Sequence, residues 1–73
     1  GRVGVKDRRA VGILASVLDD PDRAVRIRAV ESLGFLQLPQ AVAVLRLALE
    51  DRDASVRIKA TEVIGHVLAK DFE

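Results

Sequence analysis

The chain has 73 residues, with 12 basic and 11 acidic side chains, a formal net charge of +1 and no cysteine. This length allows one small domain, and the lack of cysteine excludes disulfides and thiolate zinc sites. The balanced charge provides no single-sign field to attract phosphates or anionic lipids. We therefore expect one folded domain, and the charge argues against nucleic acid or a membrane as its partner.

The N-terminal residues do not form the apolar stretch of a secretory signal, which favours a cytoplasmic protein. This region instead carries Arg2, Lys6, Arg8 and Arg9. The longest uncharged run covers 14 residues, 32–45, and Pro39 interrupts it. Because a helix needs about 20 apolar residues to cross a bilayer, the sequence predicts no membrane span.

Residues 8–38 align without gaps with residues 39–69, so the chain contains two copies of a 31-residue unit. Twelve of the 31 pairs are identical. The identities are Ala10/Ala41, Val11/Val42, Leu14/Leu45, Leu18/Leu49, Asp20/Asp51, Asp22/Asp53, Val25/Val56, Arg26/Arg57, Ile27/Ile58, Ala29/Ala60, Glu31/Glu62 and Gly34/Gly65. This internal repeat is the strongest signal in the sequence.

Each unit is predicted to form two helices, because its apolar residues recur at spacings of three and four. The first helices carry Ala10, Val11, Leu14, Val17 and Leu18, and then Ala41, Val42, Leu45, Ala48 and Leu49. The second helices carry Val25, Ala29, Leu33 and Leu36, and then Val56, Ala60, Ile64 and Val67. We expect these stripes to face the core.

Short turns are predicted between the helices. The acidic segments 19–22 and 50–53 precede the second helix of each unit, where a carboxylate can cap the helix and interact favourably with its dipole. Pro39 follows the first unit and is tolerated at a helix start, where its missing N–H would be unpaired anyway. The period therefore contains a helix, a turn, a helix and a turn.

Residues 18–36 fit the pattern Leu-x-Asp-x-Asp-x-x-Val-Arg-x-x-Ala-x-x-x-Leu-Gly-x-Leu, and residues 49–67 depart from it only at Ile64 and Val67. This pattern resembles the short HEAT-like repeats of the phycobilisome-lyase type, and the resemblance covers residues 8–69. It implies an all-α fold, an alpha-alpha superhelix (HEAT-like solenoid) of two helix-turn-helix repeats. Within a single domain, 1–73, we expect residues 1–7 to be the tail of a preceding unit and residues 70–73 to begin a following unit or a tail.

Acidic and basic residues lie four apart at the start of each second helix, as Asp22 and Arg26 and again as Asp53 and Arg57. At this spacing each carboxylate can reach its own arginine or one in the neighbouring repeat. The resemblance implies that these four residues form a structural ladder between repeats. Anion capture is the functional alternative.

The second helices also have a side opposite to their apolar stripe. In the solenoids that the chain resembles, these helices line the concave surface, which implies a shallow partner-binding face. Its residues would be Ile27, Arg28, Glu31, Phe35, Ile58, Lys59, Glu62 and His66. The alternative is an ordinary solvated face, with Ile27 and Ile58 packed against a neighbouring turn.

Two residue types within the helices have a structural and a functional interpretation. His66 is the only histidine and has no neighbours at a metal-binding or catalytic spacing, so we interpret it as paired with Glu62 on a solvated face. The HEAT-like deoxyhypusine hydroxylases use His-Glu dipeptides, whereas His66 precedes Val67. The chain therefore does not match this class of iron enzyme. Gly34 and Gly65 each cost a helix about 1 kcal/mol relative to alanine, which indicates a close approach between helices rather than a phosphate-binding loop.

These observations favour a non-catalytic protein-interaction or scaffold module, a fragment or subunit of a longer helical-repeat protein. We expect no metal and no cofactor. The expected partners are another protein, adjacent repeats, or a second copy of the chain through exposed repeat ends. Two alternatives stay open: part of a phycobilin-lyase-like assembly that binds a tetrapyrrole, and a repeat segment without independent function. The net charge of +1 and only two phenylalanines argue against nucleic acid.

Overall fold

The computed structural model describes the backbone of residues 5–70 and the side chains of residues 8–69, and this part of the chain is helical apart from its connections. The elements are α1 (Val5–Val17), α2 (Arg23–Leu36), α3 (Pro39–Ala48) and α4 (Ala54–Lys70). The all-α prediction is therefore confirmed. Helix α1 begins within the segment predicted to end a preceding unit, and residues 1–4 and 71–73 lie outside the described residues.

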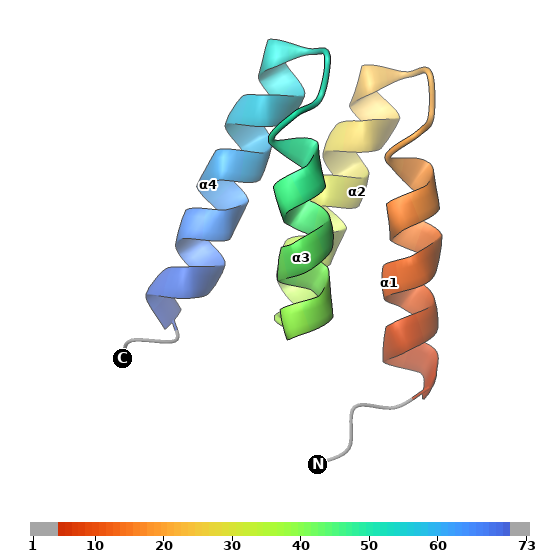
Figure 1. The fold of residues 1–73 in the computed structure, drawn as a ribbon, viewed down its shortest axis with the longest axis vertical. Helices are drawn as coiled ribbons and strands as arrows, with labels where there is room; N and C mark the ends of the chain where they lie inside the picture. Colours follow the sequence, from red (N-terminus) through yellow and green to blue (C-terminus); the bar gives the residue numbers. More distant parts are fainter. Residues whose placement is uncertain (1–4, 71–73) are drawn as a thin grey trace.

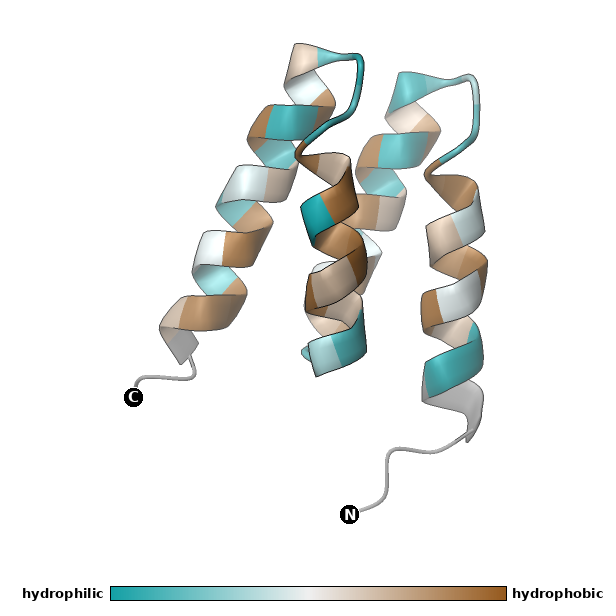
Figure 2. Ribbon diagram, in the orientation of Figure 1, coloured by the Kyte–Doolittle hydropathy of each residue, from teal (hydrophilic) through white to brown (hydrophobic). Residues whose placement is uncertain are grey.

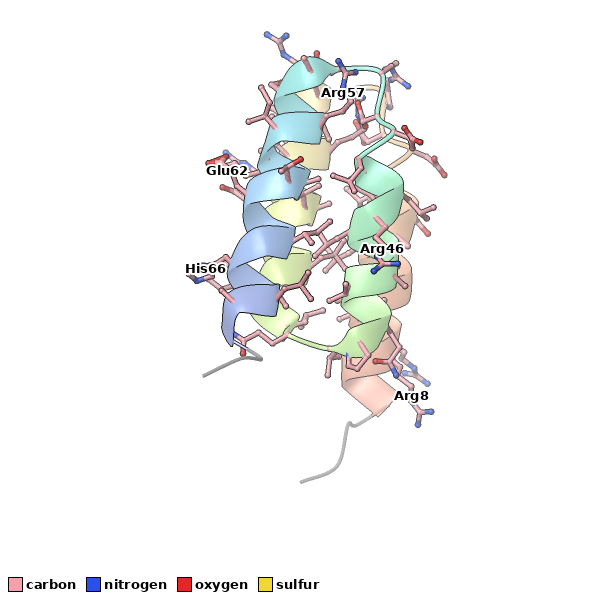
Figure 3. The ribbon with its side chains drawn as sticks, turned by 60° about the vertical axis from the view of Figure 1, so that its left-hand side comes forward. Arg8, Arg46, Arg57, Glu62 and His66 are labelled. Atoms are coloured by element: carbon pink, nitrogen blue, oxygen red, sulfur yellow. The ribbon has the colours of Figure 1, made fainter. Side chains whose placement is uncertain are left out.

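The helices are arranged in two layers, with α1 and α3 in one layer and α2 and α4 in the other (Figures 1 and 3). The first unit is the α1–α2 pair and the second is the α3–α4 pair, and their loops lie at the same end of the molecule (Figure 1). Helix α2 is central, because it packs against each of the other three helices and most extensively against α4. None of the described helices is both long and apolar enough to cross a membrane.

The loop that joins the two helices of each unit is built from two aspartates. In the first loop, Asp20 Oδ1 accepts a hydrogen bond from the backbone N–H of Asp22 at 2.8 Å. Asp22 Oδ1 in turn accepts from the N–H of Ala24 at 2.8 Å and caps α2. Asp51 and Asp53 repeat both bonds in the second loop. The predicted capping by these acidic segments is therefore present in both units.

The connection between the units also follows local chemistry. Helix α2 ends at Leu36, its C-cap Gln37 has a positive φ of 51°, and Leu38 is extended. Pro39 then begins α3, as predicted, because proline is favoured in the first turn of a helix. This short connection turns the chain back so that α3 lies beside α1 in the same layer (Figure 1).

The core is formed where the apolar sides of the four helices meet, while the two loops are hydrophilic (Figure 2). Its buried apolar residues are Val11, Ala29, Val30, Leu33, Ala41, Leu45, Ala48, Val56, Ala60 and Val67. Most of these residues belong to the predicted stripes. The core thus runs continuously through both units.

Two residues of α2 differ from the predicted stripe. Val25 is 36% exposed, although its counterpart Val56 is completely buried. The difference arises because the first unit covers Val56, whereas no described element covers Val25 in the same way. Conversely, Val30 lies outside the predicted stripe and is fully buried, while its counterpart Thr61 is exposed. Helix α2 therefore buries a second side, the one that faces α4.

The two helical glycines have different surroundings. A Cβ added to Gly34 would overlap the Cγ1 methyl of Val63 on α4. A Cβ added to Gly65 would have no neighbour within 4 Å. The predicted close approach between helices is therefore present at Gly34 and absent at Gly65, and it brings α2 and α4 together.

Candidate functional site

A buried arginine joins the two units below the loops. The Arg26 side chain is 2% exposed, and its Nε and Nη2 atoms donate to the Asp51 carboxylate at 2.9 and 3.2 Å. Its Nη1 donates to the backbone oxygen of Asp20 at 2.7 Å. One guanidinium therefore closes its own loop and binds the next loop at the same time, in the bidentate geometry that suits arginine.

The four predicted ladder residues do not pair with one another within the described part of the chain. Asp22 caps its own helix, and Arg57 donates to the backbone oxygen of Asp51 at 2.7 Å. Asp53 forms an ion pair with Arg23 of the first unit at 3.3 Å. Two of the four predicted residues thus make contacts between units, Arg26 and Asp53, but the prediction missed their partners, Asp51 and Arg23. The identity of Asp20 and Asp51 in the repeat was the available signal.

Both aspartates of the second loop have lowered pKa values. The hydroxyl and the N–H of Ser55, followed by Arg23, lower the pKa of Asp53 from its usual 3.8 to about 2. Burial alone would raise the pKa of Asp51, but the N–H of Asp53 and the guanidinium of Arg26 outweigh burial and lower it. Both carboxylates are therefore more acidic in the folded chain than in the unfolded chain.

Acid is expected to destabilise the fold through these groups. Because both folded pKa values are lowered, the contribution of each group to stability is present above about pH 4 and is lost as the pH falls through its folded pKa, which for Asp53 is about 2. Thermal denaturation from pH 5 to pH 2 should show the melting temperature falling in this window. Asp53→Asn should make the fall shallower, since asparagine keeps the cap without titrating. Asp19→Asn is the control at an exposed position; an equal fall in wild type and Asp53→Asn would contradict the assignment.

A surface groove of about 510 Å³ lies between α2 and α4. It is lined by Glu31, Gly34, Phe35, Gln37, Lys59, Glu62, Val63, His66 and Val67. The close approach at Gly34 sets the spacing of the two helices here. The Phe35 ring is 84% exposed at this groove. The groove therefore combines an apolar floor, an accessible aromatic ring and polar walls.

The structure brings five of the eight predicted partner-binding residues to this groove. They are Glu31, Phe35, Lys59, Glu62 and His66. The other three do not line it. Ile27 is half-buried and packs against the core rather than against a neighbouring turn, while Arg28 is exposed and Ile58 is 61% exposed. Val63 and Val67, which line the groove's apolar floor, were not among the predicted binding residues.

One ammonium group lies between two carboxylates along this groove. Lys59 Nζ is 3.7 Å from Glu31 across the helices and 3.8 Å from Glu62 within α4. Such exposed pairs contribute little to stability, typically about 0–1 kcal/mol, so the charges remain available to a partner. Glu62 and His66 point outward on the same side of α4 (Figure 3). No hydrogen bond joins them among the described residues, so the expected Glu62–His66 pair is not formed.

Within residues 8–69, no three metal-ligating side chains gather in a way that could hold a metal ion. The groove offers an exposed aromatic ring, short apolar side chains and alternating charges, and of these the aromatic ring is the feature that is enriched at protein interfaces.

One of the comparisons with known proteins agrees with this architecture. A family model described as HEAT repeats matches residues 1–65. Searches of the curated proteins and of the solved structures gave no match. The family match covers most of the 73 residues and includes both second helices up to Gly65. The two helical pairs, joined by one core and one buried arginine, are thus tandem units of a known repeat, and the chain belongs to the HEAT repeat family.

Proposed function

We propose that the chain is a non-catalytic interaction module that binds a protein partner through the α2–α4 groove. HEAT repeats commonly bind protein partners or act as scaffolds. The observation that supports the groove is Phe35, which exposes 84% of its surface beside Val63 and Val67. Aromatic side chains are enriched at protein interfaces and serve there as buried anchors. The cytoplasmic location of the chain stays a prediction.

The partner should present an apolar side chain to Phe35 and charged groups to the groove walls. Lys59 stands between Glu31 and Glu62, so reversing its charge would leave three neighbouring acidic groups. We therefore expect Lys59→Glu to repel an acidic partner and to alter the salt dependence of binding. Phe35→Ala would remove the apolar anchor without touching the core.

Peptides selected from a random library against the immobilised wild-type chain provide a direct test. For the selected peptides, Phe35→Ala should raise the dissociation constant by at least about tenfold, which corresponds to about 1.4 kcal/mol. Leu47→Ala is the matched control, because Leu47 is 68% exposed on α3 and lies outside the groove. Equal affinities for wild type, Phe35→Ala and Lys59→Glu would rule out the groove.

The proposal also includes association of copies of the chain through the exposed ends of the repeat pair. The alternative function, membership of a phycobilin-lyase-like assembly, predicts that a linear tetrapyrrole titrated into the chain changes its visible absorbance. An unchanged spectrum with retained peptide binding would favour the interaction module.

A further inference from the structure

We propose that copies of the chain stack head to tail, so that Arg57 of one copy pairs with Asp20 of the next copy. The donor surface, here called the trailing face, comprises Arg57, Ile58, Thr61 and Glu62 on α4. The acceptor surface, the leading face, comprises Ile13, Asp20, Val25 and Arg28. The inference rests on the proposed self-association and adds its direction and its contacts.

The trailing face exposes residues whose counterparts in the first unit are covered. Arg57 and Thr61 are exposed, whereas Arg26 is 2% exposed and Val30 is completely buried. Ile58 is likewise 61% exposed, while its counterpart on α2 is only half-buried. In the first unit, α4 provides the cover. This face of α4 comes forward in Figure 3, with Arg57 at its upper end.

The leading face exposes residues whose counterparts in the second unit are covered. Val25 is 36% exposed and Val56 is completely buried. Ile13 is 64% exposed, whereas its counterpart Val44 is half-buried against the core. Ile13 and Asp20 also line a shallow hollow of about 490 Å³. In the second unit, the equivalent surface is occupied by the first unit.

The charges of the two faces are complementary in one register. Inside the chain, three ion pairs cross between units: Arg26–Asp51, Arg23–Asp53 and Lys59–Glu31. Between two copies, the second unit of one copy takes the place of the first unit, and the first unit of the next copy takes the place of the second unit. The counterparts of the Arg26–Asp51 and Glu31–Lys59 pairs are then Arg57–Asp20 and Glu62–Arg28. The third pair is lost, because Ala54 occupies the position of Arg23. Two of the three ionic contacts are therefore reproduced by a second copy of the same sequence.

Arg57 and Asp20, the predicted partners between copies, are already held in the orientation that Arg26 and Asp51 have inside the chain. Arg57 Nη1 donates to the Asp51 backbone oxygen at 2.7 Å, the same bond that Arg26 makes to the Asp20 backbone oxygen. The Asp20 carboxylate accepts from the backbone N–H two residues later, as the Asp51 carboxylate does. Because neither group needs to be reoriented, the pair can form with little additional ordering cost.

The junction between copies should be weaker than the junction inside the chain. Thr61 replaces Val30 on the trailing face, and Ser32 on the first unit's side replaces Val63. Ser32 of the next copy would lie over Gly65, as Val63 lies over Gly34, and the space there is open. Head-to-tail contact also leaves one free face at each end, so it does not close into a symmetric dimer and grows with concentration.

Charge reversal separates this arrangement from other modes of association. The measurement is the weight-average mass by light scattering over a concentration series. Arg57→Asp alone and Asp20→Arg alone should each stay monomeric at concentrations where wild type associates. An equimolar mixture of the two should associate again, because each junction then contains one arginine and one aspartate. Arg9→Asp and Asp19→Arg are matched controls at exposed positions whose counterparts are also exposed, and both should behave as wild type.

A second pair keeps the test valid if the loop variants fold poorly. Glu62→Arg and Arg28→Glu lie on exposed helix positions and touch neither loop, and their mixture should likewise restore association. Wild type that stays monomeric at every concentration would overturn both the stacking and the proposed self-association. Association that persists in all four single variants would overturn the pairing and its direction while leaving self-association intact.

Discussion

Arg26→Met is expected to lower the free energy of unfolding by about 3–5 kcal/mol, the usual cost of removing one partner from a buried ion pair. Methionine keeps much of the apolar stem, so the loss reports mainly on the charge. The variant would leave Asp51, whose side chain is 9% exposed, without its cation. At roughly 0.1 kcal/mol per residue, the whole chain is stable by only about 7 kcal/mol. About half of the stability should therefore disappear.

The matched control is Arg57→Met, the same substitution at the equivalent position of the second unit. Arg57 is exposed and makes no ion pair within the described residues, so its replacement should cost about 1 kcal/mol or less. Urea denaturation followed by circular dichroism, at concentrations too low for association, would measure both. Similar losses in the two variants would show that Arg26 does not hold the units together.

The double variant Arg26→Met with Asp51→Asn tests the origin of the loss. Asparagine removes the uncompensated charge that the single variant leaves behind, so part of the stability should return. Because the asparagine Oδ1 can still accept from the N–H of Asp53, a double variant no more stable than Arg26→Met would show that the unpaired charge of Asp51 is not the source of the loss.

Gly34→Ala is expected to destabilise the chain by up to about 2 kcal/mol. Alanine improves helix propensity by about 1 kcal/mol, but its Cβ would overlap Val63 Cγ1, and overpacking costs about 1–3 kcal/mol. Val63 cannot easily move its methyl away, because β-branched side chains in helices prefer one rotamer. The double variant with Val63→Ala should relieve the overlap.

Gly65→Ala provides the opposite expectation at the equivalent position. The space around Gly65 is open, so only the gain in propensity remains and the variant should be more stable than wild type by up to about 1 kcal/mol. The two substitutions should therefore differ in sign in the same denaturation experiment. A stabilising Gly34→Ala would mean that α2 and α4 can separate without cost.

The fold was predictable because its signals are local and occur twice. The repeat, the spacing of apolar residues, the capping aspartates and Pro39 each specify a helix or its end without reference to distant residues. The exposed groove side was largely predictable for the same reason, since Glu31 and Phe35 lie opposite the apolar stripe of one helix.

The contacts between units could not be assigned from the stripes. A stripe on α2 identifies the side that faces its own unit, but α2 also packs against α4, which buries Val30 and half-buries Ile27. The partner of Arg26 depends in the same way on how the second loop lies beside the first. Asp22 and Asp51 are both acidic residues in a loop, and only the stacking of the units selects Asp51.

The arginine bonds within the loops affect how folding is shared between the units. Each arginine holds a carbonyl six residues earlier, so each loop is fixed by its own sequence. In a nearest-neighbour description of repeat proteins, these bonds belong to the intrinsic stability of a unit, whereas the pair with Asp51 belongs to the coupling between units. Arg26 contributes to both quantities. The same side chain therefore sets how stable the first unit is and how strongly the second unit unfolds together with it.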